Sequence, residues 1–179
     1  AAVAAQHGAG SRAVLFYGSC LREKQLEGVM LDFYLIVSDY RAAYDRRWLA
    51  TANRLIPPNV FYFEYGGLVA KYAVLSEADF ARECGLDAFT VSTAARFAQP
   101  ARLVWSADAQ AESRAMDAIS SAARTLLDWA LPVAGDGSPE AVWKCAFGLT
   151  FAAEMRAERL DRSSSIVDAE PRRYYQFGL

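Results

Sequence analysis

Two neighbouring stretches decide the fold of this chain: Val14-Leu15-Phe16-Tyr17-Gly18-Ser19-Cys20 and, further along, Met30-Leu31-Asp32-Phe33-Tyr34-Leu35-Ile36-Val37. Both are rich in aliphatic and aromatic residues, which predicts two β-strands. The first strand ends at Gly18-Ser19, and a polar segment with helical character follows from Leu21 to Glu27. The second strand carries a lone carboxylate, Asp32, near its start. The chain therefore opens with a strand, a Gly-Ser turn, a helix and a second strand that bears an acid.

This order of elements is typical of a nucleotidyltransferase core, and the chemistry explains the residues at each point. Gly18 lets the backbone come close to a triphosphate, and Ser19 can donate a hydrogen bond to a phosphate oxygen. Asp32 can hold Mg²⁺, and an unpaired carboxylate beside a buried strand is otherwise costly. The other interpretation of Gly18-Ser19 alone is a plain turn with a helix N-cap. A second acid is usual two residues after the first, on the same strand face, but that position is Tyr34.

Length and composition indicate a soluble globular protein. The chain has 179 residues, of which 54% are hydrophobic, and a formal net charge of −2. It is long enough for one domain with an appendage or for two small domains. The near-neutral charge argues against a dedicated nucleic-acid-binding protein. No run of about 18 apolar residues is present to span a bilayer, and the Ala- and Gly-rich start lacks the features of a signal peptide. We therefore expect the chain to stay where it is made, or to enter an organelle by means that this sequence does not show.

Cysteine and histidine are too few to suggest a metal centre. The 3 cysteines, Cys20, Cys84 and Cys145, are widely spaced and odd in number, which fits a reducing compartment rather than a disulfide framework. The single histidine, His7, is expected in a mobile N-terminus, which excludes a histidine-based triad.

After the first two strands, the sequence predicts a helix and then a hairpin. Tyr40 to Leu55 has the helical pattern, with Tyr44, Trp48 and Leu55 on the inner face. Gly66-Gly67 predicts a hairpin turn that places Glu64 and Lys71 on a paired ribbon. The other elements predicted in this half are strands at Val60 to Tyr65, Leu68 to Leu75 and Ala101 to Trp105, a helix capped by Ser76 with Phe80, Cys84 and Leu86 inside, and a helix at Thr90 to Phe97.

The second half of the sequence is helical. Ala107 to Ala130 is amphipathic, and a second helix is predicted from Pro139 to about Leu160. The inner residues predicted for the first of these helices are Met116, Ile119, Ala123, Leu126 and Leu127, and those for the second are Trp143, Phe147 and Phe151. Glu154 and Glu158 continue the second stripe, either because the helix leaves the core or because both acids face an active-site cleft beside Arg156 and Arg159. The predicted class is α+β: a nucleotidyltransferase-like mixed sheet with flanking helices in residues 1–106, then a helical domain, 107–179, that closes over the active site.

Several sequence blocks, taken in order, resemble one family. These blocks are Tyr17-Gly18-Ser19, Leu31-Asp32-Phe33, Val37-Ser38-Asp39, Lys71-Tyr72-Ala73-Val74, Ala95-Arg96-Phe97-Ala98-Gln99-Pro100, Phe151-Ala152-Ala153-Glu154-Met155-Arg156 and Ser165-Ile166-Val167. From about Ala13 onward, their order and spacing resemble the mitochondrial translocator-assembly-and-maintenance type of phosphatidate cytidylyltransferase and its bacterial relatives. The chain departs from the family's pattern at Gln99, where the family has Lys, and at Glu154, where it has Asp.

The resemblance implies that CTP and phosphatidate react to give CDP-diacylglycerol and pyrophosphate, with Mg²⁺ as cofactor and the protein in peripheral contact with a membrane surface. That membrane would be the bacterial inner membrane, on its cytoplasmic side, or the mitochondrial inner membrane, on its matrix side. The implied catalytic residues are Asp32 and Lys71, the nucleotide contacts Tyr17, Gly18, Ser19 and Lys71, the metal ligands Asp32 with Asp39 or Glu64, and the contacts to the lipid phosphate Arg96, Glu154 and Arg156. The acceptor explains Tyr34: a phosphate monoester near pH 7 is already mostly an oxyanion, so no second acid is needed to deprotonate it.

Two other classes of function stay open. An adenylyltransferase acting on a small alcohol would require ATP rather than CTP. A non-catalytic nucleotide-binding protein with a decayed metal site would also be consistent with Tyr34. The other interpretation of Lys71 alone is an exposed structural lysine.

Overall fold

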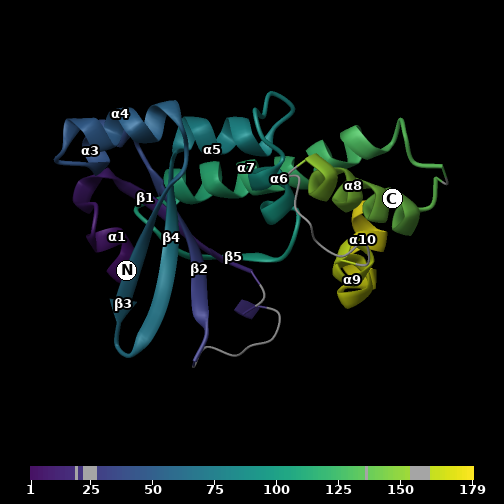
Figure 1. Ribbon diagram of the computed structural model, residues 1–179, viewed down its shortest axis with the longest axis horizontal. Coiled ribbons are helices and arrows are strands. Elements are labelled where there is room, and N and C mark those ends of the chain that lie inside the picture. Colours follow the sequence, from purple (N-terminus) through teal and green to yellow (C-terminus); the bar gives the residue numbers. More distant parts are fainter. Residues whose placement is uncertain (19, 22–27, 136, 154–161) are drawn as a thin grey trace. The chain divides into compact units, whose positions relative to one another are not determined.

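The computed structural model contains a five-stranded mixed sheet, formed by strands between residues 11 and 106 (Figure 1). Its strands are β1 (Ser11–Tyr17), β2 (Met30–Val37), β3 (Asn59–Tyr65), β4 (Leu68–Ser76) and β5 (Ala101–Ser106), in the spatial order β3-β4-β2-β1-β5. The central pair, β2 and β4, is parallel, and the other pairs are antiparallel. All five predicted strands are therefore confirmed, as is the hairpin at Gly66-Gly67, where both glycines have positive φ.

The chain divides into two compact units. The first contains Ala1–Ala81 and Pro100–Ala118, and the second contains Arg82–Gln99 and Ile119–Leu179. The structure describes residues 1–18, 20–21, 28–135, 137–153 and 162–179. Within that part of the chain, no helix has both the length and the apolar composition needed to cross a bilayer.

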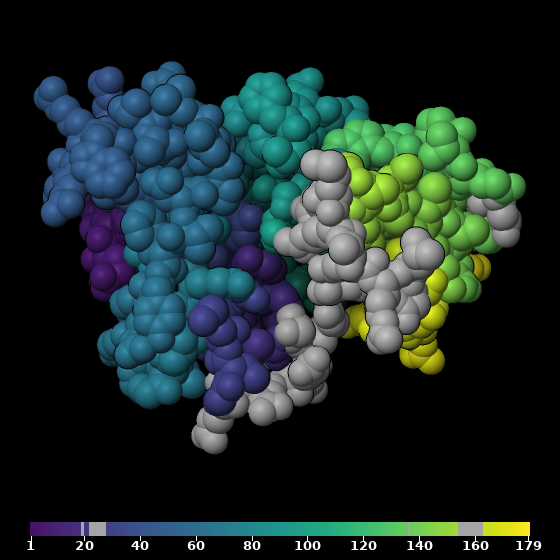
Figure 2. Space-filling model, in the orientation of Figure 1, coloured from purple at the N-terminus to yellow at the C-terminus, as the bar shows by residue number. Residues whose placement is uncertain are grey.

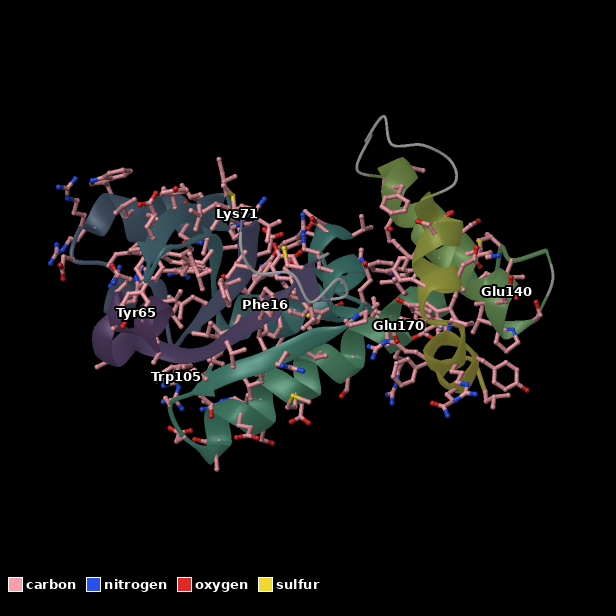
Figure 3. All side chains as sticks on the ribbon, turned by 90° about the horizontal axis from the view of Figure 1, so that it is seen from below. Phe16, Tyr65, Lys71, Trp105, Glu140 and Glu170 are labelled. Atoms are coloured by element: carbon pink, nitrogen blue, oxygen red, sulfur yellow. The ribbon has the colours of Figure 1, made fainter. Side chains whose placement is uncertain are left out.

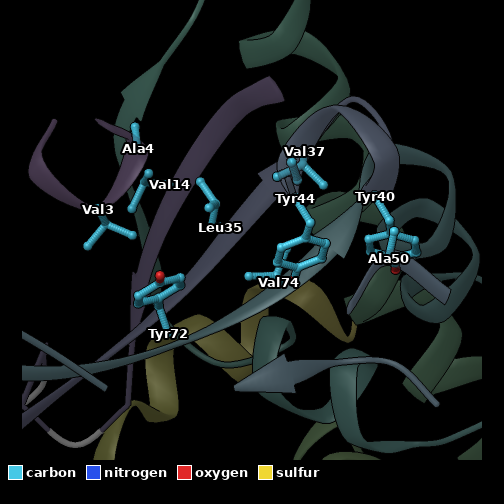
Figure 4. Close-up of a cluster of buried hydrophobic side chains, with 11 residues drawn as sticks. Val3, Ala4, Val14, Leu35, Val37, Tyr40, Tyr44, Ala50, Tyr72 and Val74 are labelled. Carbon is cyan, nitrogen blue, oxygen red and sulfur yellow. The ribbon is translucent and has the colours of Figure 1, made fainter. Parts of the chain in front are cut away.

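One face of the sheet is covered over part of its length by short helices near the N-terminus. These are α1 (Ala2–Ala5), the 3-10 turn η1 (Gly8–Gly10), α3 (Tyr40–Ala43) and α4 (Arg47–Leu55). Figure 4 shows the cluster that they form with the strands: Val3 and Ala4 of α1, Tyr40 of α3 and Ala50 of α4 lie among the buried strand residues Val14, Leu35, Val37, Tyr72 and Val74. Burial of these apolar side chains fixes the helices to the sheet.

The region from Tyr40 to Leu55, which we predicted to be one helix, is two. Asp39 caps α3, because its Oδ1 accepts a hydrogen bond from the backbone N–H of Arg41 at 2.5 Å, and the chain then becomes extended at Tyr44. The predicted inner face is wrong at Trp48 and Leu55, which are 62% and 74% exposed. In Figure 2 the part of the chain around residues 40–60 lies at the surface, in blue.

A buried asparagine takes the place of those residues on the inner face of α4. Asn53 is fully buried, accepts from the Tyr44 hydroxyl at 2.5 Å and donates to the carbonyl oxygen of Val74 in β4 at 3.0 Å. The pattern of apolar residues predicted the wrong inner face for α4, because the residue at the centre of the true inner face, Asn53, is polar. Its side chain can be buried because it forms hydrogen bonds within the protein.

His7 is also placed differently from our expectation of a mobile N-terminus. Its Nδ1 lies 2.8 Å from the carbonyl oxygen of Ala43, and its Nε2 lies 3.1 Å from the hydroxyl of Tyr72. Since the carbonyl can only accept, Nδ1 donates to it. His7 therefore joins the N-terminus to α3 and β4.

On the other face of the sheet lie the first turns of two helices, α5 (Glu77–Cys84) and α7 (Ala109–Ala130). Ser76 caps α5 as predicted, because its Oγ accepts from the backbone N–H of Asp79 at 3.1 Å. Phe80 packs near Tyr34, with ring centroids 6.5 Å apart. Arg12 of β1 pairs with Glu77 and with Asp108, at 3.4 and 2.9 Å, and so ties the start of both helices to the sheet.

Two predicted inner residues of these helices lie outside. Leu86 follows the end of α5 and is 62% exposed, and Met116 of α7 is 46% exposed. The buried stripe of α7 is instead made mostly of alanines, Ala111, Ala115, Ala118 and Ala122, followed by Leu126. Small residues there let the helix lie close to its neighbours, and hydrophobicity alone does not identify such a stripe.

The second unit is helical, as predicted for the C-terminal half. It contains α6 (Ser92–Phe97), most of α7, α8 (Pro139–Ala153), α9 (Arg162–Ala169) and α10 (Pro171–Phe177); the last two were not predicted. Trp143 and Phe147 of α8 are fully buried and pack against Tyr174 of α10, with ring centroids 5.0 and 5.6 Å from the tyrosine ring. The predicted end of α8 near Leu160 lies outside the described residues.

Candidate active site

The strand register gathers four polar side chains on one face of the sheet. Asp32 of β2 is aligned with Lys71 of β4 and with Tyr17 of β1, and Lys71 is aligned in turn with Tyr62 of β3. Residues directly opposite one another across neighbouring strands point to the same face, so these side chains form a row across four strands. Figure 3 labels Lys71 within this region of the sheet.

The centre of the row is an ion pair between an acid and a lysine. Lys71 Nζ lies 3.2 Å from Asp32 Oδ1, and the two side chains are 50% and 22% exposed. The approach does not have hydrogen-bond geometry, so the buried Oδ1 has a partner of opposite charge but no hydrogen-bond donor. Buried carboxylate oxygens normally accept a hydrogen bond. Oδ1 accepts none from the described residues, so it can take a further ligand.

Gly18 brings the turn after β1 against this carboxylate. Its φ is +93°, a conformation that residues with a side chain rarely adopt, and a Cβ atom at this position would lie 3.0 Å from Asp32 Oδ2. Both observations require glycine. The backbone of the turn thus approaches Asp32 directly.

The structure does not bring the three predicted metal ligands together. Asp39 lies beyond the far end of β2 from Asp32, roughly 20 Å away at about 3.3 Å per strand residue, and its carboxylate is engaged as the cap of α3. Glu64 shares the face of Asp32 but lies two strands away, about 10 Å across the sheet, and accepts a hydrogen bond from the Tyr62 hydroxyl.

Mg²⁺ fits this site only with Asp32 as its single protein carboxylate. Among the described residues, no group of three or more His, Cys, Asp or Glu side chains could hold a metal ion. Mg²⁺ is often held by one or two carboxylates together with substrate phosphates and water. The open Oδ1 of Asp32 meets that requirement, whereas Asp39 and Glu64 stand apart from it.

Tyr34 fills the position where a second acid is usual. Its side chain is 2% exposed, and its ring meets Tyr17 edge-on at 5.3 Å between centroids. The residue two places after Asp32 is thus part of the hydrophobic core. On the strand face of Asp32, the side chain two residues further along is therefore an aromatic ring and not a carboxylate.

Tyr62 belongs to the row but was not predicted. It is 59% exposed, and its donation to Glu64 raises the pKa of the phenol. The hairpin could have identified it, because a two-residue turn at Gly66-Gly67 aligns Tyr62 with Lys71.

The predicted contacts to the lipid phosphate are only partly described. Arg96 lies in α6 of the second unit, where its guanidinium donates to Ser92 Oγ. Glu154, Arg156 and the predicted nucleotide contact Ser19 lie outside the described residues, as do Glu158 and Arg159.

Comparisons with known proteins do not identify a family. No family model matches the chain, and no curated protein sequence matches it. Among solved structures, the chain is similar to a nucleotidyltransferase-like protein from Exiguobacterium sibiricum 255-15, with 8% sequence identity and a TM-score of 0.40. The match covers 96% of this chain and 62% of that protein. A likeness of this size establishes neither a family nor an activity.

Proposed function

We propose that the chain is a nucleotidyltransferase that moves the cytidylyl group of CTP to phosphatidate. The observation that supports the proposal is that three groups lie next to one another: the positive-φ turn at Gly18, the Asp32 oxygen that accepts no hydrogen bond from the described residues, and the ammonium of Lys71. Phosphate binding favours a glycine turn and a cation, and a metal-dependent transfer also needs an acid.

In this proposal Asp32 and Lys71 exchange partners when the nucleotide binds. The two side chains lie 3.2 Å apart and neutralise each other. Lys71 is half exposed, so its flexible stem would let the ammonium contact triphosphate oxygens, and Asp32 would be the residue that holds Mg²⁺. When bound, Mg²⁺ would offset the charge that develops on the departing pyrophosphate.

In this proposal the acceptor is a phosphate monoester, because the described residues aligned with Asp32 include no second carboxylate that could act as a base. A phosphate oxygen forms the new bond to the α-phosphorus of CTP, and the bond between that phosphorus and the oxygen bridging to the β-phosphate breaks to release pyrophosphate. Such an acceptor is largely ionised near pH 7, so no protein group has to remove a proton. A small alcohol would need that help, and the buried ring of Tyr34 occupies the position of the usual second acid.

The test is an assay with labelled CTP, Mg²⁺ and phosphatidate in detergent, followed for CDP-diacylglycerol. We expect product from the unaltered protein and a loss on the order of a thousandfold in Asp32→Asn, because the charge stabilisation of the transition state is removed. Lys71→Gln should also reduce turnover strongly. Asp45→Asn, which makes the same change at an exposed loop position, is the matched control and should leave activity unchanged.

The outcomes separate the three classes of function. Product formed from ATP and an alcohol, but not from CTP and phosphatidate, would point to the adenylyltransferase. Binding of Mg²⁺-CTP without turnover would point to a non-catalytic nucleotide-binding protein. If Asp32→Asn kept more than about a tenth of the activity, Asp32 would not be the metal ligand.

Because phosphatidate resides in membranes, the proposal also includes peripheral contact with a membrane surface. Co-sedimentation of the protein with phosphatidate vesicles tests this contact.

A further inference from the structure

A cavity of about 560 Å³ lies on the face of the sheet opposite Asp32. Phe16 and Phe33, which line it, are aligned in neighbouring strands and each stands one residue from the Tyr17–Asp32 pair. Successive side chains of a strand point to opposite faces, so the cavity and the candidate active site lie on different sides of β1 and β2. Figure 3 labels Phe16, which lines the cavity from β1, and Tyr65, which lines it from the end of β3.

No described residue of α3 or α4 lines the cavity, whereas Ala2 and Val3 of α1 line one side of it. The helices α1, α3 and α4 cover the part of this face around Val14, Leu35 and Val74. Toward the other end of the strands, Phe16, Leu31 and Ala70 form a separate buried cluster that lines the cavity. The volume lies within the range of about 300 to 1,000 Å³ that is common for small-molecule sites.

The shape of the cavity favours an elongated ligand. All five strands contribute lining residues, from Phe63 of β3 to Arg102 of β5. Four strand spacings of about 4.8 Å place these two edges roughly 19 Å apart. The side chains between them are aliphatic or aromatic apart from Cys20, so a long alkyl chain matches this surface better than a compact polar molecule.

The positive charge of Arg102, at the β5 end of the cavity, favours a ligand with a negatively charged head group. Arg102 is the one charged side chain among the described lining residues, and these include no carboxylate. It is exposed, and within the part of the chain that the structure describes it has neither an ion pair nor a hydrogen bond. A guanidinium without a partner, beside an apolar surface, binds a carboxylate through two parallel hydrogen bonds.

We propose that this cavity binds a long-chain fatty acid, with the alkyl chain across the sheet over Phe16 and Phe33 and the carboxylate on Arg102. The site is separate from the proposed nucleotidyl transfer, because it uses the other face of the sheet and none of Asp32, Lys71 or Gly18. It adds to the protein a ligand that no part of the proposed reaction requires.

The test is a titration of the full chain with palmitate, hexadecanol and hexadecylamine, measured by displacement of a fluorescent fatty acid. We expect palmitate to bind, hexadecanol to bind more weakly and hexadecylamine to bind weakest. Arg102→Gln should weaken palmitate binding about tenfold, the low end of the range for a charge-assisted hydrogen bond, and should leave hexadecanol unchanged. Arg102→Lys should keep most of the palmitate affinity.

A second variant and two controls make the result decisive. Val104 lines the cavity and is 43% exposed, so Val104→Asp places an acid beside Arg102 without altering the core, and it should weaken palmitate at least as much as Arg102→Gln. Arg54→Gln, the same change at an exposed position of α4, should bind palmitate normally, and so should Asp32→Asn. Circular dichroism verifies that each variant is folded.

Three results would each overturn the proposal. The first is an absence of palmitate binding to the unaltered protein. The second is equal palmitate affinity in Arg102→Gln and Arg54→Gln. The third is binding of hexadecylamine as tight as that of palmitate, which would show that the cavity selects apolar chains without regard to charge. Since Asp32→Asn tests only the other face, failure here leaves the proposed transferase reaction to its own assay.

Discussion

At the scale of single residues, Gly18 is the position where a one-carbon change has the most effect on the candidate site. Gly18→Ala introduces a Cβ at a positive φ and about 3.0 Å from Asp32 Oδ2. We expect a loss of about 1 to 2 kcal/mol in the free energy of unfolding, measured by urea denaturation, from the backbone conformation alone. We also expect a large loss of nucleotidyl transfer, because the new methyl group displaces the carboxylate.

Gly28→Ala separates these two effects. Gly28 also has a positive φ, +72°, but a Cβ there would meet no atom of the described residues within 4 Å. It should lose similar stability while keeping its activity. Equal activity in the two variants would show that the contact between Gly18 and Asp32 is irrelevant to the reaction.

From the sequence one could predict that Asp32 and Gly18 lie close together, but not which other acids lie near them. Asp32 and Gly18 are close because a short turn follows β1 and because β1 pairs with β2, which local patterns indicate. The grouping of Asp32 with Glu64 or Asp39 depended instead on strand register and on position along β2, which residue types do not reveal. Asp39 is near in sequence, yet a strand in between carries it to the far end of the sheet.

At the scale of elements, the attachment of α4 to β4 depends on one buried amide. Asn53→Ala removes the acceptor for the Tyr44 hydroxyl and the donor to the Val74 carbonyl. Both partners are left unsatisfied in the core, so we expect a loss of about 2 to 3 kcal/mol in the free energy of unfolding. Asn59→Ala loses one half-buried hydrogen bond, from Asn59 Nδ2 to the Leu49 carbonyl, and should change stability by less than about 1 kcal/mol. A loss in Asn53→Ala no larger than this would contradict the prediction.

The start of α7 should make stability depend on pH. The backbone N–H of Ala111 donates to Asp108 and holds the pKa of that carboxyl below its ordinary value of 3.8, with a further contribution from Arg12. A carboxyl whose pKa is lower in the folded state stabilises the fold above its ordinary pKa, and this stabilisation is lost as the pH falls through the folded pKa. Asp108→Ala should therefore have a lower urea midpoint than the unaltered protein at pH 7, and the difference should shrink below about pH 4.

A control on the same helix distinguishes this effect from general acid destabilisation. Asp128 is an exposed acid near the end of α7, and Asp128→Ala should differ little from the unaltered protein at either pH. A gap between Asp108→Ala and the unaltered protein that is unchanged at pH 3 would mean that the ionised carboxylate does not stabilise the helix start.

The helices and strands that local sequence patterns define were predicted correctly. The buried faces of α4 and α7 were not, because they depend on packing between elements. Turn chemistry at Gly66-Gly67 was sufficient to place the β3–β4 hairpin, and Ser76 was sufficient to start α5. In α4 and α7 the contact faces use Asn53 and a row of alanines, so the large apolar residues Trp48 and Met116 are left outside. These choices depend on distances between elements that no single segment encodes.

At the scale of the whole molecule, the candidate nucleotide site lies within one unit. Asp32, Lys71 and Gly18 all belong to the first unit, whereas Arg96 belongs to the second. A ligand that binds only the folded state raises the unfolding temperature of the part that binds it. If the two units melt separately, Mg²⁺-CTP should raise the transition of the first unit, and the other transition should move only if the second unit also contacts the ligand.

The size of this shift follows from the affinity. At 1 mM ligand and a dissociation constant of about 0.1 mM, native-state binding adds roughly 1.4 kcal/mol. For a chain of this length that corresponds to an increase of about 3 to 6 °C in the melting temperature. We expect this increase with Mg²⁺-CTP in the unaltered protein, a smaller one with Mg²⁺-ATP, and almost none in Asp32→Asn or Lys71→Gln. Asp45→Asn should respond as the unaltered protein does. A larger shift with ATP would contradict the choice of CTP, and an equal shift in Asp32→Asn would show that the nucleotide binds somewhere other than the strand row at Asp32 and Lys71.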